Sequence, residues 1–209
     1  MKGFFVGRCP GGVKLLLAIA LSTMGVFGAH AQWKPVEQVE SYSISGKSGR
    51  ELYASIGENG PKVGVGRVVA FTTFKLTWRR DYRPQPDGSC TLASARPKLI
   101  LIYALPKPAN TLAEPVASNW KTFYDGVRAH ERVHGDMIVE MVDEIVAYSI
   151  GLNVPNDPNC KKIRTTLTDR LSQISQAQRQ RSRDFDRVEM TDGGAVHQLI
   201  LNLVNGGRP

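Results

Sequence analysis

The sequence lacks several features that would assign it to large classes of protein. After residue 31, no uninterrupted apolar run approaches the roughly 20 residues that a membrane-spanning helix needs. Neither an internal repeat nor a low-complexity tract is present. Basic residues outnumber acidic ones, 27 to 19, but they are spread out and form no continuous cationic face with stacking aromatics. We therefore expect no stable membrane insertion and no nucleic-acid partner.

The N-terminal segment has the pattern of a secretory signal peptide. Basic residues precede a short apolar run over residues 15–27, and small residues follow up to Ala31. We expect cleavage after Ala31, so that residues 1–31 are the signal peptide and residues 32–209 form a single domain, secreted or periplasmic. Cleavage would remove Lys2, Arg8 and Lys14 and no acidic residue, and would lower the net charge from +8 to +5.

Cysteine is scarce, with 3 residues, and Cys9 lies in the expected signal peptide. The remaining two, Cys90 and Cys160, are far apart, and neither lies within a short metal-ligand spacing. In an oxidising compartment such a pair usually forms a disulfide bond. The sequence therefore predicts a Cys90–Cys160 disulfide that ties the first half of the domain to the segment after its long helix.

The first half of the expected domain, up to about residue 108, is rich in β-branched residues and interrupted by Gly and Pro. It predicts strands over residues 36–44, 68–78 and 95–105, the last two joined by a turn at residues 83–89. Ser48 is placed to cap a short helix over residues 50–56. Together these segments predict a small antiparallel sheet.

The second half is helical in character. A long helix is expected from a cap at Ser118 to Ile150, with Gly151 ending it. A second helix should follow the turn at residues 155–159 and continue toward Phe185. Its buried edge is expected to comprise Ile163, Leu167, Leu171 and Ile174. The fold class is therefore α+β, with a small sheet packed on a long helix and a second, C-terminal helix.

The sequence His130-Glu131-Arg132-Val133-His134 carries the chemistry. Histidines four apart project from one face of a helix, so both rings can bind one zinc ion. Both lie within the apolar stripe of the long helix, while Glu131 stands beside the metal and can take a proton from an activated water molecule. The alternative interpretation is a pair of core histidines with Glu131 as a surface carboxylate.

A catalytic zinc needs a third protein ligand, and here the sequence leaves alternatives open. The Gly and His that follow the second histidine in metzincins are replaced by Met137 and Glu140. The expected ligand comes from the end of the second helix. Asp186 ranks first, Glu189 second and His197 third. Glu140 and Glu144, farther along the first helix, are expected to be exposed or salt-bridged carboxylates.

These residues resemble a bacterial family of predicted secreted zinc-dependent proteases, catalogued as domain of unknown function 922. The resemblance rests on the strand ending in Trp78, on Asp87-Gly-Ser-Cys90, on His130-Glu-x-x-His134-Gly-Asp136, and on Cys160 and Phe185-Asp186. It implies a zincin-like α+β fold, zinc and peptide hydrolysis in the cell envelope. The family's later motif, Tyr-Asp-x-x-Thr-x-His-Gly, is matched only in its first part. This sequence departs from it with Glu189, Thr191 and Asp192.

The leading hypothesis is thus a secreted zinc metallopeptidase acting on a peptide or protein substrate, with Glu131 as general base. The substrate is expected to lie extended beside an exposed strand at residues 99–103. The alternative is a non-catalytic zinc-containing envelope protein that binds a peptide or cell-wall partner. A Glu131→Gln substitution separates the two, because only an enzyme would lose turnover.

Overall fold

The sheet is built on one long central strand, β5 (Cys90–Pro108), which pairs with strands on both of its edges. β4 (Phe71–Pro84) and β5 make an antiparallel hairpin, and β1 (Val36–Ile44) pairs with the other edge of β5. The strand order is β1-β5-β4, and β6 (Asn153–Val154) pairs with the start of β5. This computed structural model describes residues 33–206, so the expected signal peptide, residues 1–31, lies outside the described residues.

The sheet is mixed, which corrects the prediction of an antiparallel sheet. β1 runs parallel to β5, with Val36 opposite Ile100 and Ile44 opposite Pro108. A parallel pair requires a crossover connection rather than a tight turn. Here α1 (Gly49–Asn59) and a small hairpin of β2 (Lys62–Val63) and β3 (Gly66–Arg67) lie between β1 and the β4–β5 pair in the chain. The class predicted from the sequence, α+β, is confirmed.

The position of β5 in the sheet also corrects the expected peptide-binding strand. Residues 99–103 pair with β4 along their whole length, and residues 100–103 pair with β1 on the other edge. A further strand cannot be added there, because the main-chain groups on both edges are engaged. In the described part of the chain, β4 pairs only with β5, so the free edge of the sheet on the β4 side belongs to β4.

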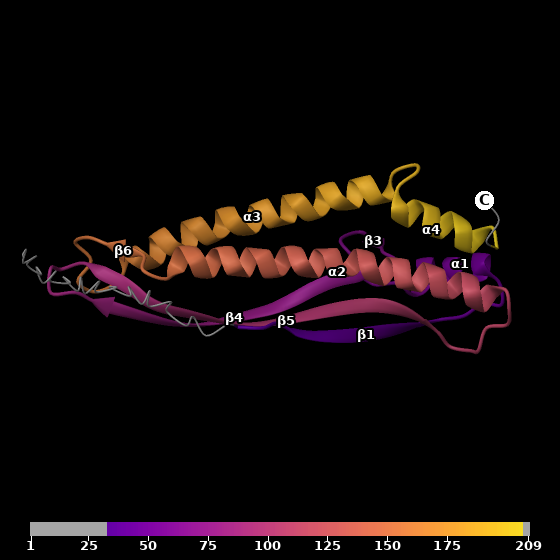
Figure 1. Ribbon diagram of the computed structural model, residues 1–209, viewed down its shortest axis with the longest axis horizontal. Helices are drawn as coiled ribbons and strands as arrows, with labels where there is room; N and C mark the ends of the chain where they lie inside the picture. The colour runs from indigo at the N-terminus through magenta and orange to yellow at the C-terminus, as the bar shows by residue number, and fades with distance from the viewer. Residues whose placement is uncertain (1–32, 207–209) are drawn as a thin grey trace, which may run out of the picture. The chain divides into compact units, whose positions relative to one another are not determined.

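Two long helices and two short ones cover one side of the sheet. α2 (Val116–Ser149) packs on β5 and β4, and α3 (Lys162–Met190) and α4 (Ala195–Val204) pack on α2. Figure 1 shows this order, with α2 between the strands and α3. Ser48 caps α1 as predicted, whereas α2 begins before Ser118, its expected cap. No described helix combines the length and apolar character needed to cross a membrane.

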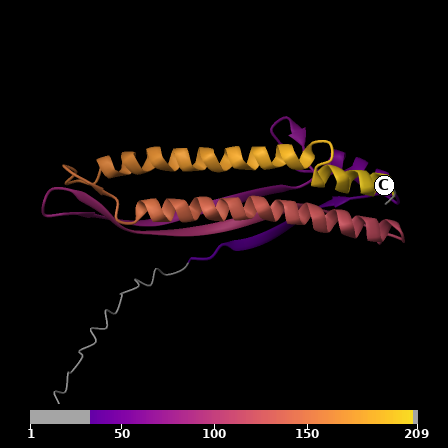
Figure 2. The same cartoon turned by 45° about the horizontal axis from the view of Figure 1, so that its top comes forward.

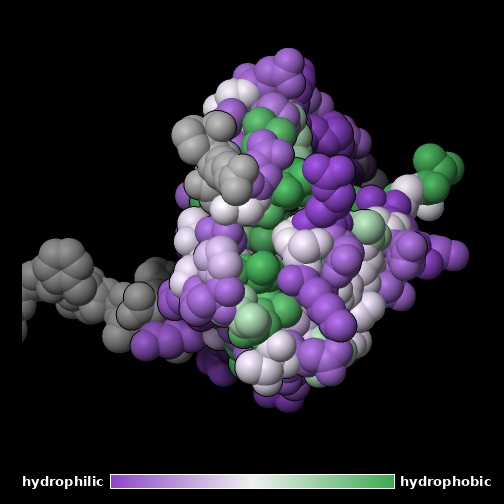
Figure 3. Space-filling model, turned by 90° about the vertical axis from the view of Figure 1, so that its right-hand side faces the viewer, coloured by the Kyte–Doolittle hydropathy of each residue, from purple (hydrophilic) through white to green (hydrophobic). Residues whose placement is uncertain are grey.

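The core lies between α2 and the sheet. Phe123, Val142, Leu99 and Leu101 are almost completely buried there. Gly135 leaves room on α2 for a side chain of β5, since a Cβ atom at this position would come within 2.3 Å of the Tyr103 hydroxyl oxygen. Figure 3 shows one end of the described part of the chain, where hydrophobic side chains lie in separate groups among hydrophilic ones.

The disulfide predicted from the sequence is confirmed. Cys90 and Cys160 are bonded across a sequence separation of 70 residues. Cys90 is the first residue of β5, and Cys160 precedes α3, so the bond joins the sheet to the start of the outer helix. Around it, Leu92, Ile163 and Leu167 form a second, smaller apolar cluster.

Candidate metal centre

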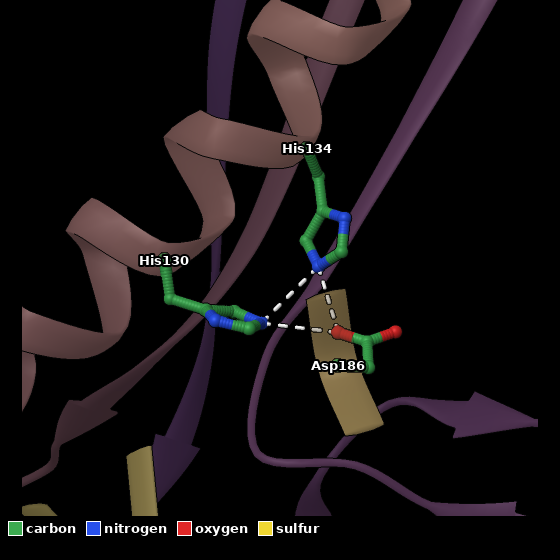
Figure 4. Close-up of side chains that lie close together, drawn as sticks. All are labelled: His130, His134 and Asp186. Carbon is green, nitrogen blue, oxygen red and sulfur yellow. Dashed lines mark hydrogen bonds and ion pairs between the residues drawn. The ribbon is translucent and has the colours of Figure 1, made fainter. Parts of the chain in front are cut away.

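Three side chains from two helices converge on one point. His130 and His134 come from successive turns of α2, and Asp186 comes from α3 (Figure 4). The Nε2 atoms of the two histidines lie 3.1 Å apart, and Asp186 Oδ1 lies 3.2 Å from His130 Nε2 and 2.9 Å from His134 Nε2. The four-residue spacing brings the two rings together, and the packing of α3 on α2 supplies the carboxylate.

This triangle fits a small divalent cation. Zinc bonds of roughly 2.0–2.1 Å in tetrahedral geometry place neighbouring ligand atoms about 3.3 Å apart. The measured sides of 2.9, 3.1 and 3.2 Å are close to that value. Two imidazole nitrogens and one carboxylate oxygen are also ligands that zinc prefers. The cluster of His130, His134 and Asp186 could therefore hold a metal ion.

Hydrogen bonding behind His134 favours the tautomer that metal binding requires. His134 Nδ1 lies 3.3 Å from Ser182 Oγ, which also accepts a hydrogen bond from the buried Gln178 amide at 3.0 Å. Because the Ser182 hydroxyl donates its own proton to Met137 Sδ at 3.8 Å, its oxygen is left to accept a hydrogen bond from Nδ1. His134 Nε2 then carries a free lone pair toward the centre of the cluster.

His130 is supported differently. Its Nδ1 atom is buried without a hydrogen-bond partner, and the nearest carboxylate oxygen is Glu189 Oε2 at 3.8 Å. A small rotation of the Glu189 side chain would allow Nδ1 to donate to it. On its face, the His130 ring stacks on Phe185 with a centroid distance of 4.7 Å and an interplanar angle of 18°. Phe185 thus fixes the plane of the ring that carries the first ligand atom.

The charges of the cluster suit a cation. Burial opposes ionisation of Asp186, but hydrogen bonds to His130 and His134 hold the pKa of this carboxyl well below its usual range. Burial alone would lower the pKa of His134, yet the hydrogen bond and charge of Asp186 raise it. Asp186 is therefore an anion in a site that attracts positive charge.

Glu131 lies beside the cluster in a buried position. Glu131 is only 5% exposed, which contradicts its interpretation as a surface carboxylate. Thr72 Oγ1 on β4 lies 2.5 Å from Glu131 Oε2 and 3.0 Å from the main-chain oxygen of Glu131. Burial raises the pKa of Glu131, and the hydrogen bond from Thr72 lowers it. The carboxylate is thus held at one oxygen beside the candidate ligands.

The centre opens into a cavity of about 640 Å³. Residues of α2, including His130 and Glu131, line its floor. The start of β4 with residues 68–70 forms one wall, and α3 forms the other. Val63 of the β2–β3 hairpin and Met190 at the end of α3 also line this cleft, and Figure 2 shows the hairpin beside that end of α3. A ligand bound there would contact both Glu131 and the free edge of β4.

The other residues considered as third ligands lie outside the cluster. Glu189 is behind the His130 ring, on the side opposite the ligand atom. His197 is on α4, where its Nδ1 accepts a hydrogen bond from the main chain of Gly193. Glu140 and Glu144 are exposed and pair with Arg181 and Arg170, as the sequence predicted.

Sequence reasoning did not find the supporting residues Thr72 and Ser182. Nothing in the sequence around Thr72 distinguishes it, since its role depends on the placement of β4 beside α2. Ser182 could have been found, because Gln178, Ser182 and Asp186 are spaced four apart and therefore share one face of a helix. A polar stripe on the buried side of α3 indicates that this face meets other polar groups.

The fold and the site define an α+β protein with a candidate divalent-metal centre between its two long helices. Residues 39–194 match the family described as bacterial protein of unknown function, DUF922, and the chain belongs to that family. No curated protein and no solved structure matches the chain.

Proposed function

We propose that this protein is a zinc-dependent peptidase with a zincin-like site. The observation that carries the proposal is the triangle of His130 Nε2, His134 Nε2 and Asp186 Oδ1, with sides of 2.9 to 3.2 Å, beside the buried carboxylate of Glu131. Two histidines and one carboxylate leave a fourth position open in a tetrahedral site, as catalytic zinc sites require. A substrate or water molecule would reach that position from the cleft, which His130, His134 and Asp186 line.

A bound zinc would polarise the scissile carbonyl group and acidify a water molecule. The chain's own residues would handle the proton. Glu131 would accept it at Oε1, because Oε2 is held by Thr72, and would later donate it to the leaving amine. Asp186 and the two histidines would hold the ion, and Ser182 and Phe185 would fix the histidine rings.

The substrate peptide would bind as an added strand along the free edge of β4. This edge replaces the β5 segment that the sequence suggested. Thr72 is part of β4 and also contacts Glu131, so a peptide paired with residues 71–74 would pass directly beside the proposed base. Phe71 and Phe74, which are 38% and 36% exposed, could contact its apolar side chains.

We propose a secreted or periplasmic location. The support is the signal-like sequence of residues 1–31 together with the Cys90–Cys160 disulfide, which is compatible with an oxidising compartment. Exposure of a proteolytic site to the cytosol would be avoided in this arrangement.

Comparison of the zinc-loaded chain with its Glu131→Gln variant tests the proposal. Denatured protein mixtures are incubated with each, and new N-termini are quantified. The variant should keep its zinc and lose about 10²- to 10⁴-fold in turnover, because general-base catalysis contributes that much. Glu140→Gln is the matched control on the same helix and should retain activity.

Two results would contradict the peptidase. Equal cleavage by the wild-type chain and Glu131→Gln would assign the activity to a contaminant or to another site. Zinc binding without any cleavage would instead support the alternative, a non-catalytic zinc-containing envelope protein that binds a peptide or cell-wall partner.

A further inference from the structure

Two arginines of α3 line the cleft without an ionic partner in the described part of the chain. Arg179 and Arg183 are four residues apart and so lie on one side of the helix. Arg179 donates a hydrogen bond to Ser175 Oγ at 2.6 Å, and Arg183 donates one to the Gln180 side-chain oxygen. Both acceptors are neutral and both residues are exposed, so neither cleft-lining arginine has its charge offset by a carboxylate of the described residues.

Three of the four α3 arginines that do not line the cleft are paired with carboxylates, Arg170 with Glu144 among them, and the fourth, Arg164, lies over the Tyr82 ring. Arg181 pairs with Glu140 at 2.8 Å, and Arg187 pairs with Asp184 at 2.8 Å. Most arginines of this helix outside the cleft are therefore compensated by a carboxylate, whereas neither arginine that lines the cleft is. Uncompensated cations that line a cavity attract anionic ligands into it.

The remainder of the cleft offers little competition for a bound anion. Among the described lining residues, the carboxylates are Glu131 and Asp186, and both belong to the candidate metal centre. Most of the other lining residues are apolar, including Val63, Phe71 and Ile138. One wall is thus apolar with a free strand edge, and the other carries two cations.

Helix geometry sets the distance between these cations and the metal centre. At about 1.5 Å per residue, Arg183 lies roughly 4.5 Å and Arg179 roughly 10.5 Å along α3 from Asp186. An extended peptide advances about 3.3 Å per residue. Side chains one to three residues from the bond at the metal centre would therefore lie opposite the two guanidinium groups.

We propose that Arg179 and Arg183 make this cleft selective for acidic peptide segments, with a carboxylate side chain within about three residues of the scissile bond. The proposal rests on the proposed peptidase function and names its substrate class. Arginine suits this role because its planar fork binds a carboxylate through two parallel hydrogen bonds. Apolar side chains of the same segment would contact Phe71 and Phe74 on β4.

Peptide binding to the full-length, zinc-loaded Glu131→Gln chain provides the test. Two fluorescent decapeptide pools share the same mixed apolar positions and differ only in carrying Glu or Gln at the polar positions. At low salt the Glu pool should bind roughly tenfold more tightly, since its carboxylates can pair with both arginines and the Gln amides cannot. The preference should fall steeply as salt is added.

Two double variants then test whether Arg179 and Arg183 cause the preference for the Glu pool. Arg179→Gln with Arg183→Gln should abolish the difference between the pools, whereas Arg181→Gln with Arg187→Gln removes the same charge outside the cleft and should preserve it. Equal binding of both pools by the parent chain would overturn the proposal. An equal loss of preference in both double variants would also overturn it, because overall charge would then be the cause.

Cleavage of the same pools by the wild-type chain separates this inference from the proposed function. Cleavage of both pools at one rate would keep the peptidase and reject acidic selectivity. Selective binding of the Glu pool without cleavage of either pool would reject the peptidase and keep the acidic-peptide site.

Discussion

The hydroxyl group of Thr72 orients the carboxylate of Glu131. The Thr72 oxygen lies 2.5 Å from Glu131 Oε2. Burial raises the pKa of Glu131, and the hydrogen bond that Thr72 donates lowers it. The proposed base works only when ionised, so activity should be lost as the pH falls through the Glu131 pKa. Loss of the Thr72 hydroxyl raises that pKa and therefore moves the acidic limb of the rate profile to higher pH.

We therefore expect Thr72→Val to lower kcat about tenfold and to shift the acidic limb of kcat/KM upward, since a hydrogen bond to a charged group contributes about 1.5–3 kcal/mol. Thr72→Ser keeps the hydroxyl and should restore both quantities. A pH profile of kcat/KM for the three proteins is the measurement. Coincident profiles for Val and wild type would show that Thr72 does not act through Glu131.

Ser182 is expected to support His134 as a metal ligand. Its oxygen lies 3.3 Å from His134 Nδ1 and receives a hydrogen bond from Gln178. Ser182→Ala should weaken zinc binding about tenfold, as losses of such supporting partners do. Zinc affinity is measured by competition with a chromophoric chelator. Ser172→Ala, an exposed position on the same helix, is the control, and equal affinities for both variants would contradict the role assigned to Ser182.

At the scale of elements, the close packing of α2 on β5 positions the histidines. Gly135 follows His134, and a Cβ atom there would overlap the Tyr103 hydroxyl oxygen at 2.3 Å. Gly135→Ala should force the buried Tyr103 ring to shift and lower the free energy of unfolding by about 1–3 kcal/mol. Urea denaturation of both the metal-free and the zinc-loaded protein measures this effect.

Gly57 provides the matched control for this substitution. It lies in α1, and a Cβ atom there would have nothing within 4 Å. Gly57→Ala should therefore stabilise the protein slightly, by about 0.4–1 kcal/mol, through the entropy of the unfolded chain. The packing account is wrong if the two alanine variants change stability equally.

Local patterns in the sequence predicted most of the elements. β1 was predicted because its residues lie between Pro35 and Gly46, which interrupt regular structure. The pairing of His130 with His134 was predicted because residues four apart share one face of a helix. The parallel β1–β5 pairing and the free edge of β4 were not predicted, because they depend on which strands meet after folding. α4 was not predicted; it is short, and Gly193-Gly194 before it separate it from the long helical pattern.

The candidate site likewise combines residues of one local motif with a residue that only packing brings there. His130, Glu131 and His134 come from one motif, whereas the position of Asp186 depends on how far α3 runs back along α2. The sequence could only rank Asp186, Glu189 and His197. Packing places Asp186 against both rings, Glu189 behind one ring and His197 on another helix.

For the molecule as a whole, the disulfide and the candidate metal centre lie near opposite ends of α3. Cys160 precedes the helix, and Asp186 lies 24 residues after its first residue, or about 36 Å at 1.5 Å per residue. Closing a loop of 70 residues contributes at most about 4 kcal/mol in the chain-entropy model. The bond should thus matter for stability more than for metal binding.

We expect the Cys90→Ser, Cys160→Ser double variant to lose up to about 4 kcal/mol in the free energy of unfolding while its zinc affinity changes only a few-fold. Urea denaturation and chelator competition measure the two quantities. Wild-type protein treated with a reductant should reproduce the variant. A double variant as stable as the oxidised wild type would contradict this account of the bond.

The central claim is that one divalent ion is held by His130, His134 and Asp186. Crystals of the protein grown with zinc, measured on both sides of the zinc absorption edge, test it most directly. The account predicts a single anomalous peak roughly 2.0–2.2 Å from His130 Nε2, His134 Nε2 and Asp186 Oδ1. Anomalous peaks only elsewhere, with the two rings turned away from each other, would contradict it.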